Sequence, residues 1–125
     1  MPRILVADDD AVQLELRRLL LEAAGHRVDL AYSASQAIRC LQAQPADLII
    51  LDLRFPNADG APDCREGIAL IRRVRALTRE MPMLVLSGWP ADLDAQPEAK
   101  LVSRVMLKPV KPADLLRAVR ELIAK

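Results

Sequence analysis

Aromatic side chains and cysteines are scarce in this sequence, and no hydrophobic run is long. The 125 residues include one Trp, one Tyr, one Phe and two Cys. Cys40 and Cys64 stand alone, without a CxxC pair or a nearby His, so they indicate two free thiols rather than a disulfide or a zinc site. No segment approaches the length of a membrane span, and no signal-peptide core follows Met1. We therefore expect a cytoplasmic protein that does not enter a membrane.

A strong net charge is also missing. Lys and Arg total 18 against 17 Asp and Glu, which gives a formal net charge of +1 at pH 7. Nucleic acids and anionic membranes attract proteins with an excess of positive charge, so this balance predicts that the chain binds no nucleic acid directly. A chain of this length forms one hydrophobic core, and we expect residues 1–125 to be a single domain.

Short apolar runs separated by helical patterns organise the sequence. The clearest run is Leu48–Leu51, because its four aliphatic residues lead directly into the carboxylate of Asp52. Unbroken runs of this kind are typical of strands that are buried on both faces of a parallel sheet. Strands are predicted over Ile4–Ala7, Val28–Ala31, Leu48–Leu51, Met83–Leu86 and Val102–Leu107.

Amphipathic helices are predicted between these strands. The first helix ends at Gly25, and its apolar residues recur at the three- and four-residue spacing of one helical face. This spacing predicts a buried stripe of Val12, Leu16, Leu19, Leu20 and Ala23. Pro90 and Pro97 interrupt the pattern before the fifth strand, so we expect a short or irregular fourth helix. Strands alternating with about five helices predict an α/β fold, a three-layer sandwich around a five-stranded parallel sheet.

In such a sheet the carboxyl ends of the strands share one edge, and ligands bind there. The residues that follow the predicted strands at this edge are Asp8, Asp9, Asp52, Ser87 and Lys108. Three neighbouring carboxylates repel one another unless a cation lies among them, and their oxygen atoms suit Mg²⁺. Each residue alone is common in an ordinary turn, but their convergence at the correct strand ends indicates a functional site.

This set of residues suits phosphoryl transfer. A metal among the carboxylates would neutralise part of the charge of a phosphoryl group, so that Asp52 could attack phosphorus and form an aspartyl phosphate. Lys108 offers a positive charge to a phosphoryl oxygen, and Ser87 offers a hydroxyl donor. The sequence thus predicts Asp52 as the nucleophile.

At these residues the chain resembles the receiver domains of response regulators in two-component signalling. Ile4–Asp10 is similar to the opening strand and acidic residues of that family. Asp52–Pro56, together with Asp59–Gly60, resembles the segment that carries its phosphoacceptor. Ser87–Gly88 and Lys108–Pro109 complete the pattern, which covers essentially the whole chain.

The resemblance implies a flavodoxin-like strand order, 2-1-3-4-5, and a Mg²⁺ site. It implies that Asp9 and Asp52 bind the metal directly together with the backbone carbonyl of Arg54, while Asp8 acts mainly through water. A histidine kinase or phosphotransfer protein would supply the phosphoryl group, and the phosphorylated surface would act on a downstream protein. The domain would be a monomer or weak homodimer that catalyses only its own phosphorylation and dephosphorylation. It would stand alone or form the receiver of a hybrid histidine kinase.

The chain departs from the family pattern in three places. Val105 stands three residues before Lys108, where the family usually has an aromatic residue that moves inward when the hydroxyl residue turns. Ala61–Glu66 precede Gly67, whereas the family normally begins its third helix sooner, and we expect these residues to form an exposed excursion. The fourth helix, within residues 89–101, is also less regular than usual.

Two other functions stay open from the sequence. The first is a metal-dependent phosphohydrolase that uses Asp52 on outside substrates, although such enzymes generally need a second acid two residues later, where this chain has Arg54. The second is a receiver-shaped interaction module that is never phosphorylated. Val105 favours this second function, whereas the complete set of acidic, hydroxyl and lysine residues disfavours it.

Overall fold

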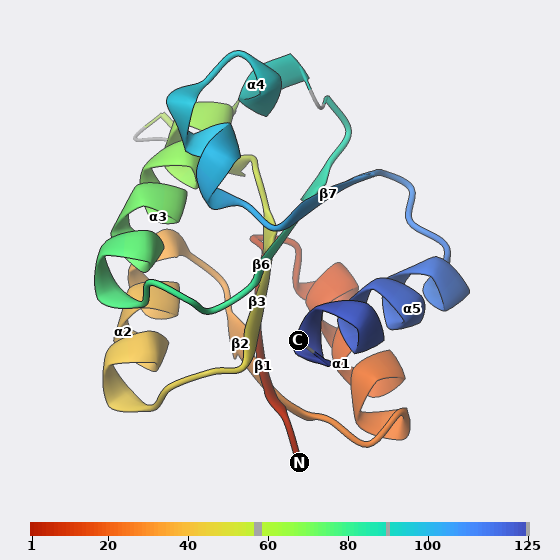
Figure 1. The fold of residues 1–125 in the computed structure, drawn as a ribbon. Coiled ribbons are helices and arrows are strands. Elements are labelled where there is room, and N and C mark those ends of the chain that lie inside the picture. The colour runs from red at the N-terminus through yellow and green to blue at the C-terminus, as the bar shows by residue number, and fades with distance from the viewer. Residues whose placement is uncertain (57–58, 90, 125) are drawn as a thin grey trace.

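A parallel sheet forms the centre of the computed structural model, which describes residues 1–56, 59–89 and 91–124 (Figure 1). Its strands are β1 (Arg3–Ala7), β2 (Arg27–Ala31), β3 (Leu48–Asp52), β6 (Met83–Ser87) and β7 (Arg104–Leu107). They follow the order β2-β1-β3-β6-β7, and every neighbouring pair is parallel. This confirms the flavodoxin-like order expected from the sequence.

Within the described residues, five α-helices flank the sheet and complete the expected three-layer sandwich. The helices are α1 (Ala11–Ala23), α2 (Ala34–Ala43), α3 (Cys64–Leu77), α4 (Ala91–Asp94) and α5 (Pro112–Ile123). Figure 1 shows α1 and α5 on one side of the sheet and α2 and α3 on the other. A 3-10 helix, η1 (Pro97–Leu101), leads from α4 toward β7. Among the described residues, no helix combines the length and apolar character that crossing a membrane requires.

Alternate residues of the central strands pack into two separate hydrophobic layers. In β1, Ile4 and Val6 belong to the layer that includes residues of α1 and α5. Leu5 and Ala7 belong to the layer that includes residues of α2 and α3. The same alternation continues along β3 and β6. The aliphatic runs are unbroken because each strand supplies side chains to both layers.

The buried face of α1 differs from the predicted one. Leu14 and Leu21 are fully buried, whereas Val12, Leu16 and Leu19 are 67%, 55% and 58% exposed. The predicted stripe, of which only Leu20 packs against the core, is therefore wrong for Val12, Leu16, Leu19 and Ala23.

Apolar residues lie on several sides of α1, so their spacing alone does not identify the side that meets the sheet. The face that carries Leu14 and Leu21 also carries Arg17, whose guanidinium forms an ion pair with Asp8 at the end of β1. Arginine is usually exposed, so an analysis of apolar spacing places Arg17 on the solvent side of the helix. The pairing of Arg17 with Asp8 cannot be detected from this spacing.

The predicted fifth strand, Val102–Leu107, is shorter and less buried than expected. Regular pairing begins only at Arg104, because Val102 is the C-cap of η1. Val105 is 36% exposed and Leu107 is 62% exposed, although both lie on an apolar strand. The prediction of a strand over residues 102–103 is therefore wrong.

The short fourth helix predicted from the sequence is confirmed. α4 spans four residues and is followed by the 3-10 helix η1. Pro97 occupies the first turn of η1, where a missing N–H is tolerated. Pro90, the other proline expected to interrupt this helix, lies outside the described residues.

Only part of the segment Ala61–Glu66 forms an exposed excursion. Strand β5 (Pro62–Asp63) pairs in antiparallel fashion with β4 (Phe55–Pro56). The carboxylate of Asp63 accepts the N–H of Arg65 at 2.9 Å and caps α3. The expectation of a loop is wrong for residues 64–66, because this cap starts the helix at Cys64.

Gly67 allows α3 to lie directly against the end of β3. A Cβ atom at this position would lie 1.8 Å from the carbonyl oxygen of Leu53, far inside any van der Waals contact. Leu53 is fully buried and directly follows Asp52. The absence of a side chain at Gly67 therefore lets α3 approach the backbone of Leu53, just after the end of β3.

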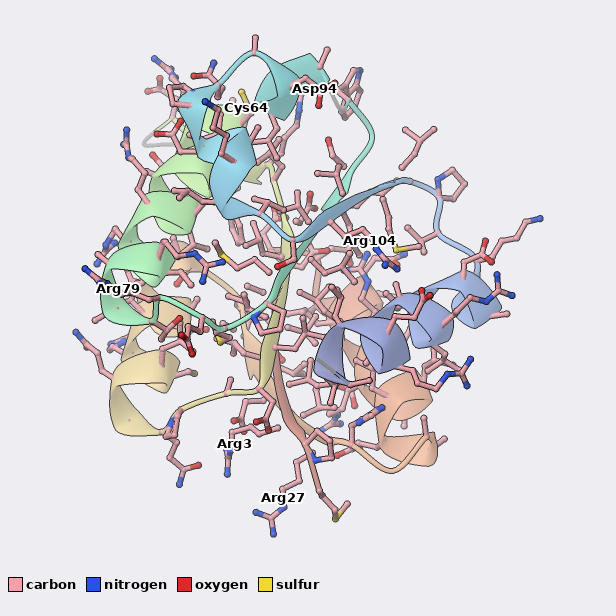
Figure 2. The ribbon with its side chains drawn as sticks, in the orientation of Figure 1. Arg3, Arg27, Cys64, Arg79, Asp94 and Arg104 are labelled. Carbon is pink, nitrogen blue, oxygen red and sulfur yellow. The ribbon has the colours of Figure 1, made fainter. Side chains whose placement is uncertain are left out.

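Figure 2 shows the two opposite ends of the molecule. Arg3 and Arg27, the first residues of β1 and β2, lie at one end, whereas Asp94 of α4 and Cys64 of α3 lie at the other. The carboxyl ends of the strands point toward the second end (Figure 1). Cys64, like Cys40, is a free thiol, as expected from the sequence.

Candidate functional site

The side chains predicted to converge come together at the carboxyl edge of the sheet. Asp8 and Asp9 directly follow β1, Asp52 is the last residue of β3, and Ser87 is the last residue of β6. Lys108 follows β7, and its N–H donates to the carbonyl oxygen of Ser87 at 2.9 Å. Strand pairing therefore brings these five residues to the same edge of the sheet.

An open pocket of about 320 Å³ lies over these strand ends. Its lining residues are Asp8, Asp9, Asp10, Gln13, Asp52, Arg54, Gly88, Trp89 and Lys108. Ser87 lies just outside this lining and is 2% exposed. The pocket is therefore walled by carboxylates and two basic side chains, with a buried hydroxyl beside it.

Asp8, Asp9 and Asp52 form a carboxylate cluster. One oxygen atom from each residue lies within 4.8 Å of the others. Carboxylate oxygens at such separations are the ligands that Mg²⁺ prefers, and Mg²⁺ keeps several waters beside one or two carboxylates. The donor set fits a divalent cation of this kind, and Arg54, whose backbone carbonyl was predicted as a ligand, lines the same pocket.

Lys108 holds the carboxylate of Asp52. Its Nζ lies 2.6 Å from Asp52 Oδ2, and the backbone N–H of Arg54 donates to Asp52 Oδ1 at 3.3 Å. Burial raises the pKa of Asp52, and the negative charge of Asp8 adds to this effect, while the hydrogen bond from Lys108 opposes it. The net result is a pKa above the usual value for Asp.

The pKa values of the two acids after β1 are shifted in opposite directions. Burial pushes the pKa of Asp8 upward, but the N–H of Asp10 and the guanidinium of Arg17 outweigh burial, so this pKa lies below its usual value. Partial desolvation raises the pKa of Asp9, and its proximity to Asp8 raises it further. Asp8 is therefore held as a charged group, whereas Asp9 is exposed to repulsion that a cation would relieve.

Ser87 is held in a defined position by the loop that follows β6. Its Oγ accepts the backbone N–H of Trp89 at 2.9 Å. The Trp89 side chain is 59% exposed, and the guanidinium carbon of Arg54 lies 4.0 Å from its ring centroid. A rotation of the Ser87 hydroxyl would thus release the backbone of an aromatic residue at the rim of the pocket.

The Arg54 side chain links the site to α4, which the sequence did not predict. Its Nε and Nη2 donate to Asp92 Oδ2 at 3.0 and 2.7 Å. The guanidinium group also lies over the ring of Trp89. Asp92 lies in the poorly patterned segment after β6, and no local spacing connects it with Arg54. Arg17 was missed for the same reason, since its pairing with Asp8 depends on the orientation of α1.

Comparison with known sequences identifies similar proteins. The chain matches the family model described as response regulator receiver domain over residues 4–120. It is 32% identical to the transcriptional regulatory protein AruR of Pseudomonas aeruginosa over 131 residues, which cover 100% of this chain and 50% of AruR. It is 31% identical to an uncharacterized 14.6 kDa protein of Leptolyngbya boryana over 121 residues, which cover 94% of this chain and 87% of that protein. The chain thus spans half of AruR, and 36% of AfsQ1 of Streptomyces coelicolor, another regulatory relative.

Comparison with solved structures concerns the fold. A response regulator receiver domain protein of Clostridium thermocellum has a TM-score of 0.85 at 24% identity, covering 99% of this chain and 95% of that one. The response regulator protein TrrA of Thermotoga maritima, solved in complex with Mg²⁺-BeF, has a TM-score of 0.84 at 22% identity, covering 98% and 99%. Both structures share the sandwich architecture described above.

Proposed function

This chain belongs to the family of response regulator receiver domains, and from that premise we propose that it is a signalling domain phosphorylated on Asp52. One observation carries the proposal. The Asp52 carboxylate lies at the end of β3, 2.6 Å from Lys108 Nζ and within 4.8 Å of oxygen atoms of Asp8 and Asp9. A nucleophile, a cation for the phosphoryl oxygens and a metal-binding pair of acids are thus present in one pocket.

In the proposed reaction, an Asp52 oxygen attacks the phosphorus of a phosphorylated histidine on a partner protein. A phosphorus–oxygen bond forms, the phosphorus–nitrogen bond breaks, and its electron pair leaves with the imidazole. Lys108 then moves its hydrogen bond from the carboxylate to a phosphoryl oxygen. Ser87 donates its hydroxyl to another phosphoryl oxygen, and we propose that its Oγ turns toward that oxygen and away from the N–H of Trp89, which it now accepts.

The proposed cofactor is Mg²⁺, held directly by Asp9, Asp52 and the backbone carbonyl of Arg54, with Asp8 acting mainly through water. When bound, the ion would neutralise charge on the phosphoryl group during transfer. The chain itself supplies the three carboxylates and aligns them through the strand ends. Burial and the nearby charge of Asp8 raise the pKa values of Asp9 and Asp52, and a bound cation would relieve the repulsion among the carboxylates.

The partners proposed are a histidine kinase or phosphotransfer protein as donor and a downstream protein as target of the phosphorylated surface. The family membership supports this pair of partners. We propose further that the domain is cytoplasmic, is a monomer or weak homodimer, and catalyses only its own phosphorylation and dephosphorylation. In place of the second acid that aspartyl phosphohydrolases use, Arg54 is engaged with Asp92 and Trp89, which supports a signalling role over hydrolysis of outside substrates.

Acetyl phosphate labelling tests the proposal. Incubation with acetyl phosphate and Mg²⁺ should give a hydroxylamine-sensitive label, and chelation of the metal should prevent it. Continuous release of phosphate far in excess of protein would instead indicate a hydrolase. Absence of label at every Mg²⁺ concentration would indicate an interaction module that is not phosphorylated.

Replacing Asp9 with Ala should weaken Mg²⁺ binding by about 10- to 100-fold, because a direct oxygen ligand is removed. The rate of labelling by acetyl phosphate should fall at low Mg²⁺ and recover in part at high Mg²⁺. Isothermal titration calorimetry measures the affinity. Glu22→Ala, which removes an exposed acid from the last turn of α1, is the control and should bind Mg²⁺ like the wild type. Equal affinity of the Asp9→Ala variant would place the metal elsewhere.

Trp89 fluorescence should change modestly with Mg²⁺ and more strongly with Mg²⁺ and beryllofluoride, which mimics a phosphoryl group on Asp52. The reason is that Ser87 Oγ now accepts the Trp89 N–H, and this contact should change when Oγ turns toward a phosphoryl oxygen. The ring also rests against the Arg54 guanidinium, so a shift of the loop alters its surroundings. Trp89 is the only tryptophan, which makes the signal specific.

The Asp52→Asn variant provides the control for this experiment. Its fluorescence should not respond to beryllofluoride, because no carboxylate is available to hold the mimic. A response that survives the substitution would show that the signal does not come from the site. A silent Trp89 in a wild-type protein that is demonstrably phosphorylated would place this residue outside the moving part.

A further inference from the structure

Arg17 carries a permanent charge on the inward face of α1. It follows Leu14 by three residues and precedes Leu21 by four, and these two leucines are the fully buried residues of the helix. The Arg17 side chain itself is only 11% exposed. Removing a guanidinium from water is unfavourable unless a carboxylate and hydrogen bonds replace the solvent. A specific partner must therefore hold Arg17 in this place.

That partner is Asp8, one of the three carboxylates of the proposed metal site. Arg17 Nη1 lies 2.7 Å from Asp8 Oδ2, and the Asp8 side chain is 1% exposed. The other oxygen, Asp8 Oδ1, accepts the N–H of Asp10 at 3.0 Å. Both oxygens of this carboxylate are thus engaged by donors from the chain itself.

The charge of the cluster follows from its ion pairs. Lys108 pairs with Asp52, and Arg17 pairs with Asp8, whereas Asp9 forms no ion pair within residues 1–56, 59–89 and 91–124. The guanidinium of Arg54 lines the pocket, but it pairs with a carboxylate outside the cluster, that of α4. Three carboxylates and two paired cations leave the cluster with a net charge of minus one.

We propose that Arg17 is a resident counter-charge that sets the Mg²⁺ affinity of this site, an inference that rests on the proposed function. By neutralising Asp8, the guanidinium relieves repulsion among the carboxylates when no metal is bound. The same charge repels an entering divalent ion and reduces the negative charge that would attract it. The affinity of oxygen sites for divalent ions depends on the number of uncompensated carboxylates. Removing the charge of Arg17 should therefore tighten Mg²⁺ binding by about tenfold or more.

Calorimetric titration of four proteins with Mg²⁺ tests this role. The proteins are the wild type, R17Q, D8N and the double variant D8N/R17Q. Glutamine keeps a hydrogen-bond donor for Asp8 but removes the charge, whereas the double variant restores the net charge of the wild-type cluster. We expect R17Q to bind Mg²⁺ most tightly, the wild type and the double variant to bind with similar affinity, and D8N to bind most weakly.

A merely structural ion pair would give a different result. R17Q would then lose alignment of Asp8 and would bind Mg²⁺ with the wild-type affinity or more weakly, which would overturn the proposal. If R17Q does not fold without metal, D8N and D8N/R17Q supply the same comparison, because neither protein contains a buried carboxylate without its cation. Equal Mg²⁺ affinities of these two variants would then overturn it.

Failure of this inference is distinguishable from failure of the proposed function. The calorimetric experiment needs no phosphoryl donor, whereas the proposed function is tested by labelling of the wild type at saturating Mg²⁺. A labelled wild type together with unchanged affinity in R17Q would reject only the role of Arg17. A wild type that is never labelled would reject phosphorylation. The role of Arg17 would still be tested by whether R17Q binds Mg²⁺ more tightly than the wild type.

Discussion

Replacing Asp52 with Asn should reduce phosphoryl labelling to background while the protein stays folded. The amide has nearly the shape of the carboxylate, but it offers no anionic oxygen to attack phosphorus. Its single amide oxygen can replace only one of the two Asp52 oxygens that now accept hydrogen bonds, Oδ2 from Lys108 and Oδ1 from the backbone N–H of Arg54, so one of these donors loses its partner. The substitution also removes the repulsion by Asp8, so we expect the free energy of unfolding to change by less than about 2 kcal/mol.

The measurement is the amount of hydroxylamine-sensitive label after incubation with acetyl phosphate and Mg²⁺, together with the melting temperature. Glu80→Gln is the matched control, because it neutralises an exposed acid that precedes β6 at the opposite edge of the sheet. This control should be labelled like the wild type. Label retained by the Asp52→Asn variant at the level of the control would refute Asp52 as the phosphoacceptor.

Replacing Gly67 with Ala should destabilise the domain severely, although alanine is normally the better helix former. The added Cβ atom would lie 1.8 Å from the carbonyl oxygen of Leu53 and 2.6 Å from its carbonyl carbon. Neither α3 nor the backbone after β3 can move without disturbing buried residues, since Leu53 and the inward face of α3 are buried. We expect a loss of about 3 kcal/mol or more and a fall in melting temperature of roughly 10 °C.

Thermal unfolding with a matched glycine variant checks this prediction. Gly88→Ala is the control, because a Cβ atom built there meets nothing within 4 Å. Its melting temperature should stay close to that of the wild type. The added Cβ atom would press on Leu53, which directly follows Asp52. The displacement should disturb the position of Asp52, so the Gly67→Ala variant should be labelled more slowly by acetyl phosphate even below its melting temperature. A Gly67→Ala protein as stable as the wild type would mean that α3 does not pack against β3 as described.

The sequence was sufficient to predict the fold and the members of the site, because both depend on local patterns. An aliphatic run such as Leu48–Leu51 indicates a strand buried on two faces, and alternation of such runs with helices restricts the topology to a parallel sheet. Once the strands are parallel, their carboxyl ends meet at one edge. The strand order that places Asp8, Asp52 and Lys108 close together along this edge was implied by the resemblance to receiver domains, and the structure confirms it.

Other features could be determined only from the tertiary structure. The inward side of α1, the pairing of Arg17 with Asp8 and the contact of Arg54 with Asp92 each join residues from different elements. The exposure of Val105 likewise does not follow from the apolar pattern of β7.

The physical reason is that periodicity records only which side chains of one element share a face. It does not record which face another element will meet, or whether a charge on that face finds a partner. On α1, apolar residues lie on several sides, and the side that packs inward carries Leu14, Arg17 and Leu21. The ion pair with Asp8 makes burial of Arg17 acceptable, and that pair exists only after α1 has packed beside the end of β1.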